Sequence, residues 1–149
     1  MRRITHTTPA TPEQVWSVLA DGWLYASWVV GASRIRDVDA HWPAPGSRIH
    51  HSVGLWPLVI DDITESLPAP DNALVLSARA WPAGKARVSV TVEPAAEGSR
   101  LAMDEYAETA PVSWIPYPVQ FTAVAPRLRE CLVRLALLAQ RRPDRGGPA

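Results

Sequence analysis

The sequence has little cysteine, little lysine and no net charge. Cys131 is the only cysteine among 149 residues, so no disulfide can form within the chain. Lys85 is the only lysine, and 15 basic residues balance 15 acidic ones, which leaves no charge surplus of the kind that binds nucleic acid. No apolar run is long enough to span a bilayer, so we expect no stable membrane insertion.

The composition that remains is that of a globular protein. Hydrophobic residues make up 47% of the chain and charged residues 20%. This predicts one domain over residues 1–142 and a disordered tail over residues 143–149. Arginine in place of lysine, together with many alanines and prolines, indicates a GC-rich bacterial genome. The first six residues lack the apolar core of a signal peptide, so we expect a cytoplasmic protein.

A long amphipathic helix is predicted over residues 126–142, with Pro126 in its first turn and Pro143 after its end. At about 100° per residue, one side of this helix is apolar. The apolar residues are Leu128, Cys131, Leu132, Leu135, Leu138 and Ala139. Val133 and Leu137 interrupt the polar side, which allows a second contact with a partner or another copy of the chain. Cys131 on the apolar side is interpreted as a small buried hydrophobe.

The chain before this helix is predicted to form about seven strands and two short helices. Thr11 followed by Pro12 and Gln14 is typical of a helix start with a capping box. A second short helix is expected between Trp23 and Trp28. The predicted strands cover residues 3–8, 33–38, 47–53, 58–66, 73–81, 87–93 and 99–108. Short turns between them favour an antiparallel sheet with one buried face, and residues 109–121 are interpreted as a linker.

Three short motifs, in this order, resemble the polyketide cyclase/dehydrase and lipid-transport group of the START-like (SRPBCC) superfamily. They are TPEQVW at residues 11–16, PGSRI at 45–49 and GSRL at 98–101. The resemblance covers about residues 1–141. It implies an α+β helix-grip fold, in which a curved antiparallel sheet of about seven strands wraps around the C-terminal helix. It also implies a cavity for an apolar or aromatic ligand, and it implies no cofactor and no common set of catalytic residues.

Two polar residues share an apolar strand face and are the candidates for chemistry. His51 alternates with Ile49 and Val53, and Glu105 alternates with Leu101 and Met103. An imidazole and a carboxylate facing a cavity could orient a ligand or act as base and acid. If Glu105 is desolvated, its pKa would rise towards the range of a general base. Alternatively, Glu105 lies near the strand end and an arginine or water satisfies it.

Other site chemistries have little support. His50 and His51 are neighbours on a strand and point to opposite faces, so they cannot chelate one metal ion, and we expect no metal site. Asp61 and Asp62 are separated in the same way. No nucleophile elbow or glycine-rich phosphate loop is present.

Tryptophan is abundant, with seven copies. Trp42, Trp56 and Trp81 each precede a proline where a strand should end. In a helix-grip fold, Trp23, Trp28, Trp114 and Tyr117 would come from segments that cap the cavity mouth, although any one of them could be plain core.

Three functions are left open. The first is binding of a small hydrophobic molecule, lipid-like or polyketide-type. The second is a polyketide cyclase or dehydratase that uses the same cavity, with Glu105 and His51 as catalytic candidates. The third is a non-enzymatic interaction domain, a homodimer included. The residues predicted to contact a ligand are Trp28, His51, Val53, Val90, Met103, Glu105, Trp114, Tyr117, Leu128 and Leu132.

Overall fold

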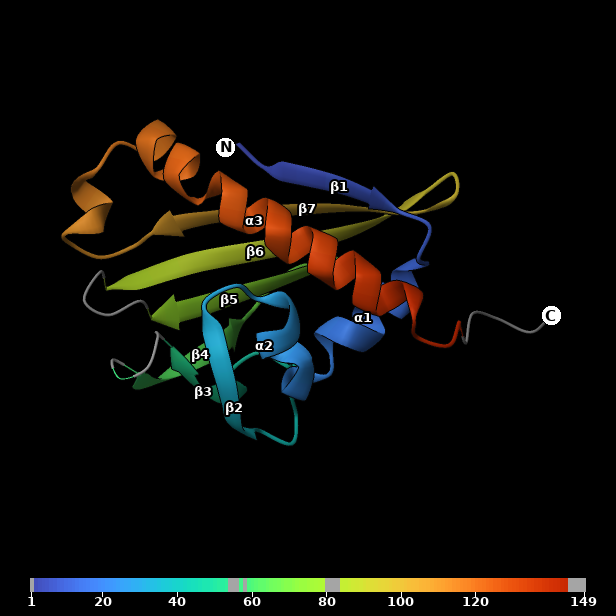
Figure 1. The fold of residues 1–149 in the computed structure, drawn as a ribbon, viewed down its shortest axis with the longest axis horizontal. Helices are drawn as coiled ribbons and strands as arrows, with labels where there is room; N and C mark the ends of the chain where they lie inside the picture. The colour runs from blue at the N-terminus through green and yellow to red at the C-terminus, as the bar shows by residue number, and fades with distance from the viewer. Residues whose placement is uncertain (1, 54–56, 58, 80–83, 145–149) are drawn as a thin grey trace.

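A computed structural model of the chain describes residues 2–53, 57, 59–79 and 84–144, with Ser33 and Val53 described by their backbone alone. Within them, seven antiparallel strands form an open sheet in the order β1-β7-β6-β5-β4-β3-β2 (Figure 1). The strands are β1 (Ile4–Thr8), β2 (Ala32–Val38), β3 (Arg48–Val53), β4 (Ile60–Leu67), β5 (Ala73–Arg79), β6 (Lys85–Ala95) and β7 (Gly98–Ala107). Strands β2 to β7 form a meander in which consecutive strands are neighbours. Strand β1 pairs with β7, so β1 and β2 are the two edge strands of the sheet.

Two short helices follow β1, as the sequence predicts. Helix α1 (Pro12–Leu19) begins with a complete capping box, because Thr11 accepts from the Gln14 amide and Gln14 accepts from the Thr11 amide. A 3-10 turn, η1 (Gly22–Leu24), leads directly into helix α2 (Tyr25–Trp28). The Gln14 side chain also donates to the Arg142 carbonyl, which ties α1 to the end of the chain's last helix.

The last helix, α3 (Tyr117–Gln140), lies diagonally across one face of the sheet (Figure 1). Its predicted apolar side is confirmed: Leu128, Cys131, Leu132, Leu135 and Ala139 are buried and Leu138 is half-buried. The sheet supplies the facing side chains by strand alternation. In the β6–β7 register, Val90 lies opposite Met103 and Val92 lies opposite Leu101, and all four are buried.

The predicted start of α3 is wrong. The helix covers Tyr117–Gln140, so Pro118 occupies its first turn and Pro126 lies inside it. Residues 109–121 are therefore not a plain linker but contain the 3-10 turn η2 (Val112–Trp114) and the beginning of α3. Proline cannot donate the helical hydrogen bond at position 126. Contacts of Gln120 with the end of β7 and with η2 hold the two turns before it.

The element order and the position of α3 define a helix-grip fold, which confirms the α+β class predicted from the sequence. Among the described residues, no helix combines the length and apolar character needed to cross a bilayer. The predicted disorder of the tail falls mainly on residues 145–149, which lie outside the described residues.

Candidate functional site

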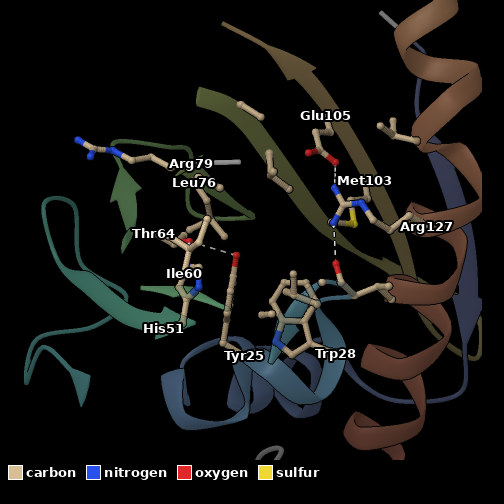
Figure 2. A pocket seen from close by; sticks show the side chains of 18 residues that line it. Tyr25, Trp28, His51, Ile60, Thr64, Leu76, Arg79, Met103, Glu105 and Arg127 are labelled. Carbon is tan, nitrogen blue, oxygen red and sulfur yellow. Dashed lines mark hydrogen bonds and ion pairs between the residues drawn. The ribbon is translucent and has the colours of Figure 1, made fainter. Parts of the chain in front are cut away.

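A cavity of about 360 Å³ lies between the sheet, helix α2 and the N-terminal half of α3 (Figure 2). Helix α2 and the loop after it form one wall of the cavity, and the inner face of β3 to β7 forms the second. The third wall is formed by Val124 and Arg127 of α3. Most of the lining is apolar, including Trp28, Leu76 and Met103. The remaining lining residues are Tyr25, Val29, Val30, Gly31, Ala32, His51, Ile60, Thr64, Ala78, Arg79, Ala86, Val88 and Glu105.

Polar groups occupy two separate positions on this wall. On one side, His51 Nε2 lies 2.7 Å from Thr64 Oγ1, and the Tyr25 hydroxyl lies 3.3 Å from the same oxygen. The Tyr25 and His51 rings are 5.5 Å apart between centroids. The Thr64 hydroxyl can donate one hydrogen bond and accept others, so it links the two aromatic side chains. Figure 2 shows this cluster across the cavity from Glu105 and Arg127.

Burial governs the protonation of this aromatic cluster. Desolvation lowers the pKa of His51 below its usual 6.5, although the nearby Asp62 carboxylate acts in the opposite direction. Desolvation also raises the pKa of Tyr25, and the hydrogen bond with Thr64 offsets part of this rise. The cluster therefore presents a neutral imidazole and a protonated phenol to the cavity at neutral pH.

The second polar position is an ion pair between Arg127 and Glu105. Arg127 also donates from Nη1 to the Val30 carbonyl at 3.0 Å, while the Val30 amide donates to Cys131 Sγ at 3.4 Å. Both backbone groups of Val30 are thus held by α3, which fixes the loop between α2 and β2. Glu105 lines the cavity, and its carboxylate is paired with an arginine, as the alternative interpretation of the sequence expected. Its role as a ligand contact or general base stays a prediction.

Cys131 belongs to the scaffold. Its side chain is fully buried, and burial raises the pKa of its thiol, so the reactive thiolate is disfavoured. Among the described residues, no group of three or more His, Cys, Asp or Glu side chains is arranged to hold a metal ion.

Four of the predicted ligand contacts line the cavity: Trp28, His51, Met103 and Glu105. Val90, Leu128 and Leu132 are buried in the core and are not among the residues that line the cavity. The side chain of Val53 lies outside the described residues. Whether any of these residues contacts a ligand stays a prediction.

Of the four aromatic residues predicted to cap the mouth, Trp28 alone is among the residues that line the cavity. Trp114 is 79% exposed on η2 and Trp23 is 58% exposed on η1, and neither is among the lining residues. Tyr117 donates its hydroxyl to the Arg2 carbonyl and holds the start of α3 against the N-terminus. Trp42 is buried, with its indole N–H donating to Leu19, whereas Trp56 and Trp81 lie outside the described residues.

Sequence reasoning did not find Tyr25, Thr64 and Arg127. Arg127 lies on the side of α3 that the helical pattern assigns to solvent, and it turns back towards β7. Thr64 belongs to β4, whose buried positions Asp62, Thr64 and Ser66 are all polar. An apolar alternation could not identify that face. The available signal was Tyr25 itself, a large aromatic residue within a predicted short helix.

The neutral state of His51 gives acid sensitivity to the fold. In the unfolded chain His51 takes up a proton near its ordinary pKa of 6.5, whereas in the folded chain its pKa is lower. The folded state is therefore at its most stable, as far as His51 is concerned, above pH 6.5. It loses free energy of unfolding as the pH falls below that value. We expect His51→Asn to lose less unfolding free energy than the wild type between about pH 7 and about pH 5, measured by urea denaturation.

The matched control is His50→Asn. His50 lies on the opposite face of β3, where its Nε2 is 3.7 Å from Asp39 Oδ1. An equal pH dependence in the wild type and the His51→Asn variant would contradict the assignment.

Comparisons with known proteins identify the family. Residues 1–140 match the family described as polyketide cyclase/dehydrase and lipid transport, and the chain belongs to that family. No curated protein matches the chain. Protein NE0264 from Nitrosomonas europaea has a similar structure, with a TM-score of 0.70, 14% identity and 94% of each chain covered.

Two further solved structures are similar. A protein from Rhodobacter sphaeroides has a TM-score of 0.68 at 21% identity, with 93% of this chain and 91% of that chain covered. The di-domain ARO/CYC protein BexL from the BE-7585A biosynthetic pathway has a TM-score of 0.66 at 14% identity. The match covers 95% of this chain and 50% of BexL. These likenesses show a shared fold.

Proposed function

We propose that the protein binds a small hydrophobic molecule in the cavity between the sheet and α3. The observation that carries this proposal is a space of about 360 Å³ with a largely apolar lining, next to the buried core that α3 forms with the sheet. Most of the affinity comes from apolar area removed from water, on the order of 25 cal/mol per Å². The rings of Tyr25 and Trp28 favour a flat, aromatic ligand over a purely aliphatic one.

The two polar positions give the ligand an orientation. The Arg127 guanidinium offers N–H donors to a carbonyl or carboxylate oxygen. The cluster of Tyr25, His51 and Thr64 on the other side offers hydroxyl groups and a neutral imidazole. A ligand with oxygens at both ends would be fixed by both positions, whereas a hydrocarbon would form no hydrogen bond with either.

A second candidate is a cyclase or dehydratase that works in the same cavity. It is favoured by the neutral His51 imidazole, which could accept a proton from a carbon beside a carbonyl group. The resulting enolate would attack a second carbonyl of the same chain, which forms the carbon–carbon bond that closes the ring. The alkoxide would take the proton back from the His51 imidazolium, and loss of water would then leave a carbon–carbon double bond in the ring. BexL and a second similar structure, StfQ from the steffimycin biosynthetic pathway, are di-domain ARO/CYC proteins.

One experiment tests the proposal and separates the two candidates. The purified protein is incubated with phenyl ketones, fatty acids and a linear poly-β-ketone. The bound molecules are then recovered, and their masses are measured by mass spectrometry. Binding predicts a stoichiometric complex from which the ligand is recovered with unchanged mass. A product lighter by one water molecule would favour the cyclase, and no complex with any compound would reject both.

A homodimer and a cytoplasmic location stay predictions. Val133 and Leu137 are 37% and 52% exposed on α3, which leaves them free to meet a second copy. A single monomeric species in light scattering at high concentration would contradict self-association.

A further inference from the structure

A second apolar chamber adjoins the main cavity. It has a volume of about 250 Å³ and lies between the ends of β6 and β7 on one side and η2 with the first turns of α3 on the other. Its lining residues are Gly84, Lys85, Ala86, Glu105, Tyr106, Ala107, Val112, Ile115, Val119, Gln120, Ala123 and Val124. The chamber exists because α3 begins at Tyr117, two turns before Pro126.

Gln120 forms the hydrogen bonds that connect the elements around this second chamber. Its Oε1 accepts from the Ala107 amide at 2.9 Å, and its Nε2 donates to the carbonyls of Val112 and Ile115 at 3.1 and 2.7 Å. These bonds connect β7, η2 and α3 around the chamber. Because both the oxygen and the nitrogen of the Gln120 carboxamide are hydrogen-bonded to the backbone, this side chain adds little polarity to the interior of the chamber.

The two chambers meet at Glu105. Ala86, Glu105 and Val124 line both of them, and Arg127 lies on the main-cavity side of the same wall. Figure 2 shows the Arg127 guanidinium next to the Glu105 carboxylate. The same guanidinium donates to the Val30 carbonyl. Arginine has five N–H donors, and the two hydrogen bonds found within the described part of the chain use two of them. A ligand oxygen at this junction could therefore accept a further hydrogen bond.

The walls of the two chambers differ in chemistry. The main cavity is lined by the rings of Tyr25, Trp28 and His51. The second chamber is lined mainly by valine, isoleucine and alanine, with Tyr106 as its one aromatic residue among those described. Aromatic rings pack well against aromatic walls, and alkyl chains fill aliphatic ones.

We propose that the second chamber is a subsite for the alkyl tail of an elongated ligand. The aromatic head of that ligand occupies the main cavity, and a carbonyl oxygen between head and tail accepts from Arg127 at the junction. The ligand class is thus an aryl alkyl ketone or a molecule of the same pattern. This inference rests on the proposed binding function and adds the position and nature of the tail.

The test is a series of phenyl ketones with lengthening tails, from acetophenone through butyrophenone and hexanophenone to octanophenone. Affinity for the wild-type protein is measured by tryptophan fluorescence. Each buried methylene should tighten binding about fourfold until the second chamber is full. Ala123→Phe and Ala107→Ile each place extra side-chain volume in that chamber and should abolish the gain from longer tails.

Thr122→Phe is the matched control, because Thr122 is exposed on the same helix and does not line the chamber. It should keep the dependence on tail length. A steep gain with tail length in both chamber-filling variants, equal to that of the wild type, would overturn the second subsite while leaving the main cavity in place. Failure of every ketone to bind the wild type would overturn the aryl alkyl ketone class, whereas the proposed function itself would be rejected only if the fatty acids and the poly-β-ketone also formed no complex.

Discussion

Replacement of Leu135 by alanine is expected to lower the free energy of unfolding by about 2–5 kcal/mol. Leu135 is fully buried on the side of α3 that faces the sheet. Alanine is the best helix former, so the loss reflects missing contacts and the cavity left behind, not a weaker helix. Urea denaturation, followed by far-UV circular dichroism, measures the change.

Leu137→Ala provides a matched control on the same helix. Leu137 is 52% exposed, and its replacement should change the unfolding free energy by no more than about 0.5 kcal/mol. The difference between the two changes in unfolding free energy tests which side of α3 packs against the sheet, because the two leucines are only two positions apart. Equal effects from the two substitutions would show that the helix is not packed as described.

Filling the main cavity is expected to remove ligand binding. Ala78 lies on β5 with its side chain on the cavity wall, opposite Ala86 in the register with β6. Ala78→Phe introduces a ring into the space proposed for the ligand's aromatic head. We expect the affinity for octanophenone to fall at least about 100-fold, which corresponds to about 2.7 kcal/mol.

Ser77→Phe is the control for this substitution, because Ser77 is the preceding residue of β5 and points to the opposite face of the sheet. It should retain wild-type affinity. Both variants should first be shown to unfold cooperatively, so that loss of binding is separated from loss of structure. Wild-type affinity in a folded Ala78→Phe variant would place the ligand elsewhere.

Local patterns account for much of the fold that could be predicted. The capping box at Thr11 and Gln14 depends on neighbouring residues, and the structure has it. The alternation of Val88, Val90 and Val92 assigns the inner face of β6 in the same way. The start of α3 could not be predicted, because a proline near a helix start and one inside a helix look alike in sequence. The contacts of Gln120 that decide between them are with the end of β7 and with η2.

The site was harder to predict because its polar residues break the patterns that identify a core. Glu105 and His51 could be found since each interrupts an apolar strand face. Arg127 reaches the cavity from the polar side of its helix, and Thr64 lies on a strand whose inner face is polar throughout. Both positions depend on how distant elements pack, which a single sequence does not show.

The most direct test of the central claim is the methyl NMR signal of Met103. Met103 lies on the cavity wall and is one of only two methionines in the chain, so its ¹³C-methyl resonance can be assigned by substitution. Addition of octanophenone should shift this resonance in the wild-type protein and leave it in place in the Ala78→Phe variant. An unchanged Met103 signal, at ketone concentrations that saturate the fluorescence response, would contradict a ligand held between the sheet and α3.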